Sequence, residues 1–349
     1  MTDYPSFKVA AAHVAPVFLQ VEATVEKACS IVREAARNGA QLVAFPEAFI
    51  PAFPVWCALQ SPIHNHDLFR QLAASSIRAP GPEIAAVSEA ARNAGVFVSL
   101  GFNEGTDASV GCIWNSNVLI GDDGRVLCHH RKLVPTFYEK LVWAPGDGGG
   151  LRVADTRIGR LGALICGENT NPLARYTLIA QGEQVHVSTY PPVWPTHDPE
   201  TGANYDLRRA IEIRAGAHSF EGKLFNVVAA GFLDKDAHDR LAARDIDAGR
   251  LIDESPRGVS MVIGPDGAPL GETLQEEEGL LYADIDLAKC VEPKQFHDVV
   301  GGYNRFDIFK LTVDRSAQRP ISFEPGPNEA APTRAGQAEQ EAGDGVLLG

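Results

Sequence analysis

The chain has 349 residues, of which 45% are hydrophobic, so it is long enough to bury a large core in one or two domains. Its formal net charge of −14 argues against nucleic acids and anionic membranes as partners. The six cysteines include no Cys-x-x-Cys pair, which argues against a zinc site or a disulfide framework and favours the reducing cytoplasm. Residues 1–8 lack the apolar core of a signal peptide. No apolar run in the chain is close to the length of about 20 residues that a membrane-spanning helix needs.

The first half of the chain alternates between strand and helix patterns. Residues 7–15 and 41–45 are short apolar runs, which predict buried strands. Between them, residues 21–38 carry apolar side chains at helical spacing and end at Gly39, a typical residue for closing a helix. The segment 46–67, rich in proline and aromatic residues, is expected to form a structured loop with room for a short helix. The pattern next predicts a helix at 82–93, a strand at 96–102, and a hairpin of strands at 114–120 and 125–130.

The second half continues this alternation and then loses its pattern. We expect strands at 151–155, 160–166, 185–188, 225–230, 259–263 and 279–285, and helices at 173–181 and 205–220. The charged segment 234–255 is interpreted as a surface insertion with a short helix. Together these elements predict one α/β domain over residues 1–318, with helices covering sheets. Residues 319–349, dominated by Ala, Gly, Glu and Gln, predict a flexible tail.

Three reactive side chains lie at or just beyond the ends of predicted strands: Glu47, Lys132 and Cys166. Because the strand ends of one sheet gather at one rim, the three can converge there. Taken singly, each residue type more often has an ordinary structural role, since a free cysteine is usually buried and a lone charge is usually solvated. The hypothesis of a catalytic site therefore depends on all three occurring together.

A carboxylate, an ammonium and a thiol make chemical sense as a set. A thiol has a reference pKa of about 8.5 and needs a base or a cation to react as a thiolate. Glu47 can take the proton, and Lys132 can stabilise negative charge on the sulfur and then on the substrate. The apolar run before Cys166 and the small and polar residues after it predict a strand-to-turn elbow, with backbone N–H groups beside the sulfur.

Longer motifs surround these residues: Phe45-Pro46-Glu47-Ala48-Phe49, His130-Arg131-Lys132-Leu133-Val134-Pro135-Thr136 and Leu164-Ile165-Cys166-Gly167-Glu168-Asn169. In order and spacing they resemble the nitrilase branch of the carbon–nitrogen hydrolase superfamily, from residue 8 to residue 311. The resemblance implies a four-layer α-β-β-α sandwich with two sheets packed face to face. It implies Glu47, Lys132 and Cys166 as the catalytic triad, with Glu139 as a second catalytic carboxylate near the lysine.

The same resemblance implies the reaction and the partners. The expected reaction is hydrolysis of a small-molecule nitrile to the carboxylic acid and ammonia, through a thioimidate and a thioester on Cys166. No metal and no organic cofactor is expected, and the pair His64 and His66 is interpreted as ordinary surface histidines. Subunits are expected to pair into dimers and to build larger oligomers or spirals.

Residues that flank the motifs are candidates for the substrate pocket. Four are aromatic, and aromatic walls suit an aryl or arylalkyl nitrile: Phe53, Trp56, Tyr190 and Trp194. Gly167 is a fifth candidate. Relatives usually carry tryptophan directly after the nucleophile, and the absence of that indole ring here should open or reshape the pocket wall. Near the end of the domain, Gly302 stands where many relatives carry histidine, so that segment departs from the family's pattern.

Two other functions compete with a nitrilase. An amidase or N-carbamoyl hydrolase would use the same triad on a C(=O)–N bond, and Gly167 makes this alternative more credible. A non-catalytic scaffold of the same fold is the other alternative. Thiol labelling separates a scaffold from an enzyme, because an activated Cys166 should react with iodoacetamide faster than the other cysteines and below their reference pKa.

Overall fold

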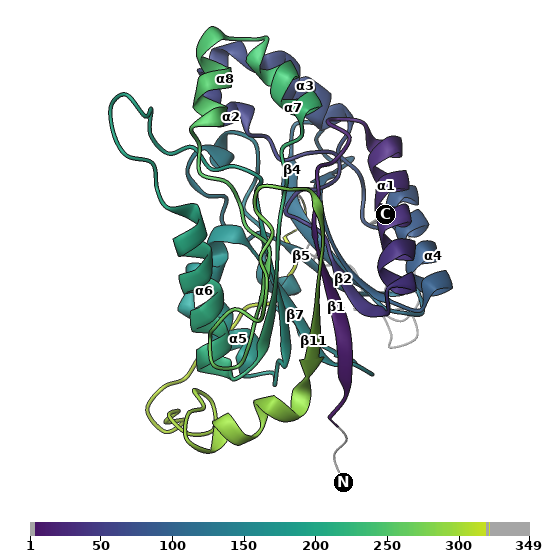
Figure 1. Ribbon diagram of the computed structural model, residues 1–349, viewed down its shortest axis with the longest axis vertical. Helices are drawn as coiled ribbons and strands as arrows, with labels where there is room; N and C mark the ends of the chain where they lie inside the picture. Colours follow the sequence, from purple (N-terminus) through teal and green to yellow (C-terminus); the bar gives the residue numbers. More distant parts are fainter. Residues whose placement is uncertain (1–3, 319–320, 322–349) are drawn as a thin grey trace, which may run out of the picture.

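Two β-sheets pack face to face, and helices cover the outer face of each (Figure 1). The computed structural model describes residues 4–318 and residue 321, so the tail expected at 319–349 lies outside the described residues except at that one position. The strands of the first sheet have the order β11 (Gly279–Asp286), β1 (Ser6–His13), β2 (Ala40–Ala44), β3 (Phe97–Gly105), β4 (Ile113–Ile120) and β5 (Val126–Arg131). Those of the second have the order β10 (Met261–Ile263), β9 (Phe225–Ala230), β8 (Val185–Tyr190), β7 (Gly159–Ile165) and β6 (Ala154–Thr156). The four-layer α-β-β-α sandwich is confirmed.

Side chains alternate between the two faces of each buried strand. In β1, Val9 and Ala11 belong to the core between the sheets, while Ala10 and Ala12 belong to the core under the helices. In β8, Val187 faces the first sheet and His186 faces the covering helices. Since both faces are covered, these strands appear in the sequence as continuous apolar runs.

The covering helices follow the predicted positions. Helices α1 (Val21–Arg37) and α4 (Pro82–Ala94) pack on the first sheet, while α5 (Pro172–Ile179) and α6 (Leu207–Gly222) pack on the second (Figure 1). The apolar stripe of α1 is buried, and the chain leaves this helix through Gly39 at φ +85°. α4 likewise begins at a proline and ends at Gly95 in the left-handed region.

Two predicted loops contain more helix than the sequence analysis expected. The segment after Glu47 holds α2 (Trp56–Leu59) and α3 (His66–Ala74). The interpretation of 234–255 as a surface insertion with one short helix is wrong, because α7 (Lys235–Ala242) and α8 (Ile246–Asp253) bury one face. Leu241 and Ile252 join the same apolar cluster as Trp56. Charges on the exposed faces of these short helices hide the buried spacing in the sequence.

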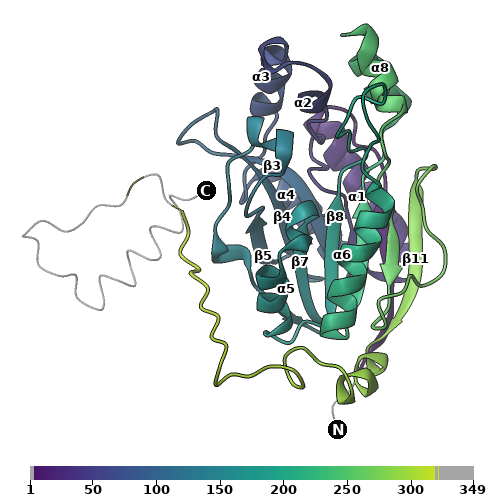
Figure 2. The same ribbon diagram turned by 90° about the vertical axis from the view of Figure 1, so that its left-hand side faces the viewer.

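The chain after β11 forms an arm along the molecule. Two 3₁₀ turns (Leu287–Cys290 and Glu292–Gln295) lead into an extended segment that passes the second sheet's helices (Figure 2). Its far end is anchored by Gln318, whose N–H donates to Asp147 Oδ2 at 2.9 Å. Several large apolar side chains of this arm are exposed, including Phe306 and Phe309. Within the described part of the chain, no helix has the length and apolar character needed to cross a membrane.

Candidate active site

The three predicted catalytic residues meet between the two sheets. Glu47 follows β2 and Lys132 follows β5 in the first sheet, whereas Cys166 follows β7 in the second. The prediction that the rim of one sheet gathers all three is therefore wrong. They converge because the two sheets are stacked and present these strand ends on the same side.

Lys132 is the charged centre of the site. Its Nζ lies 2.7 Å from Glu47 Oε1 and 2.6 Å from Glu139 Oε2, and all three side chains are fully buried. Its ammonium also lies 5.7 Å from the centre of the Trp143 ring. The structure thus places Glu139 beside the lysine, where the resemblance implied it. Burying these charges is tolerable because they pair at hydrogen-bond distance.

The two oxygens of Glu47 have different surroundings. Oε1 accepts hydrogen bonds from Lys132 and from Asn115 Nδ2, the latter at 2.7 Å. Oε2 is buried and has no hydrogen-bond partner among the described residues. A carboxylate oxygen of Glu47 and the Cys166 Sγ lie within 4.8 Å of each other. One oxygen therefore fixes the carboxylate in place, and the other is free to exchange a proton with the thiol or with a water.

Cys166 occupies a strained turn. The strand β7 ends at Ile165, and Cys166 adopts φ +51° before a short 3₁₀ helix from Cys166 to Thr170. This conformation is uncommon for a residue with a side chain, and it points the thiol away from the strand direction. The first amides of the helix, including that of Gly167, the residue next to Cys166, lack intrahelical partners. The predicted strand-to-turn elbow is present.

Gly167 is in close contact with the loop that follows Lys132. A Cβ atom on Gly167 would lie 2.7 Å from Thr136 Oγ1. Thr136 is held in turn, because its N–H donates to Glu139 Oε2 at 2.6 Å. The space beside the nucleophile at this point is filled by Thr136, so a larger residue at position 167 would have to displace it.

Burial, together with the nearby carboxylates, favours the protonated form of the Cys166 thiol. Burial raises the pKa of this thiol well above its usual range, Glu47 raises it further, and Lys132 opposes both effects. Burial also raises the pKa of Glu139 to about 7, against the influence of Lys132. The resting site therefore holds the protonated thiol beside Glu47, the residue expected to take its proton. Burial and the carboxylates outweigh one ammonium, so the proton must leave as the sulfur attacks.

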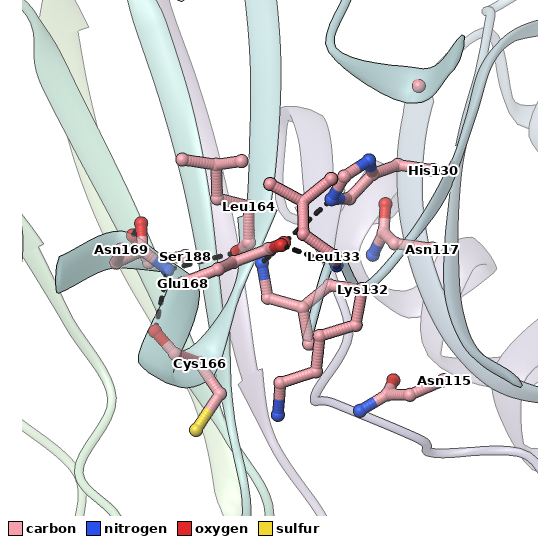
Figure 3. A network of polar contacts seen from close by, with 12 residues as sticks. Asn115, Asn117, His130, Lys132, Leu133, Leu164, Cys166, Glu168, Asn169 and Ser188 are labelled. Carbon is pink, nitrogen blue, oxygen red and sulfur yellow. Dashed lines mark hydrogen bonds and ion pairs between the residues drawn. The ribbon is translucent and has the colours of Figure 1, made fainter. Parts of the chain in front are cut away.

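Glu168 connects the nucleophile turn, residues Cys166–Thr170, to the loop that begins at Lys132 (Figure 3). Its Oε1 accepts from Ile165 N at 2.6 Å and lies 2.7 Å from His130 Nε2, while Oε2 accepts from Leu133 N at 3.0 Å. One buried carboxylate thus joins the end of β7 to the end of β5. This contact sets the position of Cys166 relative to Lys132 across the two sheets.

Asn169 supports the turn from the other side. Its Nδ2 donates to the carbonyl oxygens of Cys166 and Leu164 (Figure 3), and its Oδ1 lies 3.0 Å from His186 Nε2. His186 in turn lies 2.6 Å from Glu183, which also contacts His218. This buried chain of hydrogen bonds holds the turn against α6.

Two clusters of described residues have side chains of the types that bind metals. One is Glu183 with His186 and His218, and the other is Glu47 with Glu139 and Cys166. In the first, the carboxylate is hydrogen-bonded to both rings. In the second, the Lys132 ammonium lies between the two carboxylates. Each carboxylate group in the two clusters thus already has a hydrogen-bonding partner within the chain.

The structure buries the aromatic residues predicted for the pocket. Phe53, Trp56, Tyr190 and Trp194 belong to the same apolar cluster as Cys166. Phe53 and Trp194 pack their rings at 6.2 Å, while Trp56 packs against Phe18. A small cavity beside Glu47 is lined by Phe53 and by residues from the ends of β1 and β9. Whether these side chains bind substrate stays a prediction.

Sequence reasoning missed several residues of the site. Tyr138 and Trp143 complete the aromatic cluster, with Tyr138 4.6 Å from Trp194. Asn115, Ser116 and Asn117 interrupt an otherwise apolar strand, and this buried polar run was the available signal. Glu168 and Asn169 stand in the quoted motif, but nothing in the sequence tells which strand they contact.

Comparisons with known proteins found relatives of this chain in sequence and in fold. The sequence profile of the family described as Carbon-nitrogen hydrolase matches residues 8–295. A protein named Nitrilase 3, from an unknown prokaryotic organism, is 36% identical, and the match covers 89% of this chain and 91% of its own. An arylacetonitrilase of Aspergillus kawachii is 35% identical, with 96% and 98% covered. A carbon–nitrogen hydrolase structure from Helicobacter pylori aligns with a TM-score of 0.65 over 87% of this chain and 97% of its own, at 20% identity.

Proposed function

The chain belongs to the carbon–nitrogen hydrolase family, and on this premise we propose that it is a nitrilase with Cys166 as nucleophile. The unpaired Oε2 of Glu47 is the observation that carries this proposal, since it is the proton acceptor that a protonated, buried thiol needs. Lys132 and Asn115 hold the other oxygen of the same carboxylate. Relatives named nitrilase, with more than 85% of both chains aligned, support the same reaction.

The reaction starts as the Sγ–C bond forms. Glu47 accepts the thiol proton while the sulfur attacks the nitrile carbon, and the nitrile nitrogen takes up a proton to give a thioimidate. Glu47 then activates a water, which adds to that carbon. Lys132 and the amide of Gly167 stabilise the charge of the tetrahedral species. The C–N bond breaks, ammonia leaves, and a thioester remains on Cys166.

A second water completes the cycle. Activated by Glu47, it attacks the thioester carbon, the C–S bond breaks, and the carboxylic acid leaves as the thiol regains its proton. Glu139 keeps Lys132 oriented and balances its charge through the 2.6 Å contact. If the tetrahedral species expelled the sulfur instead of ammonia, the product would be an amide.

An aromatic nitrile suits the surroundings of the nucleophile. Rings of Phe53, Tyr138, Trp143 and Trp194 pack against one another next to the catalytic groups. Such a wall favours a flat apolar substituent on the nitrile carbon. The name arylacetonitrilase, carried by some relatives, is in line with this preference.

We also propose that the chain self-associates and works in a reducing compartment such as the cytoplasm. The C-terminal arm exposes Phe306, Ile308 and Phe309, and a patch of this kind favours contact with a second copy. All six cysteines are free, as expected under reducing conditions.

The test of the reaction is ammonia release from phenylacetonitrile, benzonitrile and an aliphatic dinitrile, each beside its amide, with Cys166→Ala as control. We expect a nitrile to be hydrolysed, its amide to be left untouched, and the variant to be inactive. Turnover of amides alone would make the protein an amidase with the same triad. Inactivity on every nitrile and amide would favour a scaffold.

A further inference from the structure

Arg214 lies beside the nucleophile turn without a carboxylate partner. It sits in α6 between the buried positions Ile211, Ala215 and His218, so its half-buried side chain points toward the body of the protein. Its Nε donates to Thr170 Oγ1 at 2.7 Å, and Thr170 is the last residue of the 3₁₀ helix that begins at Cys166. A second guanidinium nitrogen donates to Tyr205 Oη.

The partners of Arg214 are all neutral, and this sets it apart. Among the described residues, the other arginines that are at least partly buried lie within 4.0 Å of a carboxylate; they are Arg78, Arg131, Arg175, Arg250 and Arg257. Arg214 makes no such ion pair within that part of the chain. A guanidinium that is partly removed from water and bound only by hydroxyls retains an unmatched charge and unused N–H donors.

Arg214 links the nucleophile turn to the apolar cluster that contains Cys166 and Tyr190, because its other partner, Tyr205, packs on that cluster. Its positive charge also opposes the burial-driven rise in the pKa of the Cys166 thiol. It does the same for Tyr190, whose fully buried hydroxyl has no hydrogen-bond partner among the described residues. The guanidinium and the unsatisfied Tyr190 hydroxyl thus both adjoin the cluster that holds the nucleophile, and both offer donors to an anion.

We propose that Arg214 binds a carboxylate group of the substrate, so that the preferred substrate is a nitrile that carries a carboxylate away from the reacting carbon. This inference rests on the proposed nitrilase function and specifies its substrate class. The carboxylate would pair with the free edge of the guanidinium, while Thr170 and Tyr205 hold that group in position. The aromatic wall would contact the part of the substrate between the carboxylate and the nitrile.

The first test is a ratio of rates for two nitriles of similar size, 4-(cyanomethyl)benzoate and 4-methylphenylacetonitrile. Arg214→Gln should lower kcat/KM for the anionic nitrile relative to the neutral one by about 10- to 100-fold, the effect of losing one charge-assisted pair. Arg209→Gln, on the exposed side of the same helix, should leave the ratio unchanged. An equal loss on both nitriles in Arg214→Gln would overturn the proposal.

The second test needs no turnover and so separates this proposal from the nitrilase reaction. Iodoacetate and iodoacetamide are similar in size but differ in charge. Each is allowed to alkylate the protein at alkaline pH, and peptide mass analysis gives the rate at which it modifies Cys166. Any change in the thiolate population cancels in the ratio of the two rates. Arg214→Gln should lower the iodoacetate-to-iodoacetamide ratio at Cys166 by about 10-fold and leave it unchanged at the partly exposed Cys112. If the iodoacetate-to-iodoacetamide ratio at Cys166 were the same in the wild type and in Arg214→Gln, the proposal would be overturned, even if size-exclusion chromatography showed altered assembly. Altered assembly would then assign Arg214 to a subunit interface.

Discussion

Replacing Glu168 with glutamine should weaken both the fold and catalysis, because this carboxylate joins the two halves of the site. Glutamine can still accept hydrogen bonds from Ile165 N–H and His130 through one oxygen. Its NH₂ group would then face the Leu133 N–H, which loses its acceptor. Losing one hydrogen bond to a charge and leaving a partly buried N–H unpaired should lower the free energy of unfolding by about 3 kcal/mol.

The kcat of the folded Glu168→Gln variant should also fall, beyond any loss of activity that unfolding would cause. Leu133 is the neighbour of Lys132, so the lost contact frees the loop that carries the ammonium. A displacement of about 1 Å at a reacting group lowers the rate by about 100-fold. We therefore expect Glu168→Gln to lower kcat for the nitrile by about that factor, measured at a temperature where the variant is fully folded.

Glu104→Gln is the matched control. Glu104 is equally buried and binds Ser116, His129 and Arg131, but its side chain lies on the opposite face of the first sheet and, among the described residues, is hydrogen-bonded only to strands of that sheet. Its replacement should lower the free energy of unfolding by a similar amount, in urea denaturation, and change kcat by less than about 3-fold. If both variants lost kcat equally, the connection between the two sheets would not be what positions the site.

Three further predictions concern charge, pH and assembly. Lys132→Met leaves two carboxylates facing each other, so ammonia release should fall by about 100- to 1,000-fold and the free energy of unfolding by about 3 kcal/mol; near-normal turnover would contradict the assigned role. Burial lowers the pKa of His218 to about 4, so the folded protein keeps it neutral while the unfolded chain binds a proton below about pH 6.5. The free energy of unfolding should therefore drop by about 3 kcal/mol as the pH falls from 6.5 to 4, and His218→Gln should lose this part of the slope, which urea titrations at each pH can measure. Replacing both Phe306 and Phe309 with serine should shift the protein to smaller species in light scattering, whereas Val110→Ser, also highly exposed, should not.

The sequence was sufficient for the helices and strands whose patterns are simple. Apolar runs predicted the buried strands, and the helical spacing from residue 21 to Gly39 predicted α1 almost to its ends. Charged residues hid the buried faces of α7 and α8, because each helix is short and covers the core with only a few side chains. The motifs also placed Glu47, Lys132 and Cys166 at strand ends.

How the site is assembled could not be predicted from the sequence. The pairing of Glu168 with Leu133 and His130 joins positions 35 and 38 residues apart on different sheets, and no local pattern specifies it. The raised pKa of the Cys166 thiol depends on burial by side chains from many elements. Arg214 resembles any helix-surface arginine until the absence of a carboxylate near it, within the described part of the chain, is known.

The central claim is that Cys166 forms a covalent bond to the nitrile carbon with Glu47 as its proton acceptor. The most direct measurement is acid quenching during turnover of the best nitrile of the panel, followed by peptide mass analysis of the wild type and Glu47→Gln. We predict an acyl or imidoyl adduct on Cys166 alone in the wild type, and little adduct in Glu47→Gln because the thiol keeps its proton. Ammonia release without an adduct on Cys166, or undiminished release by Cys166→Ala, would contradict the account.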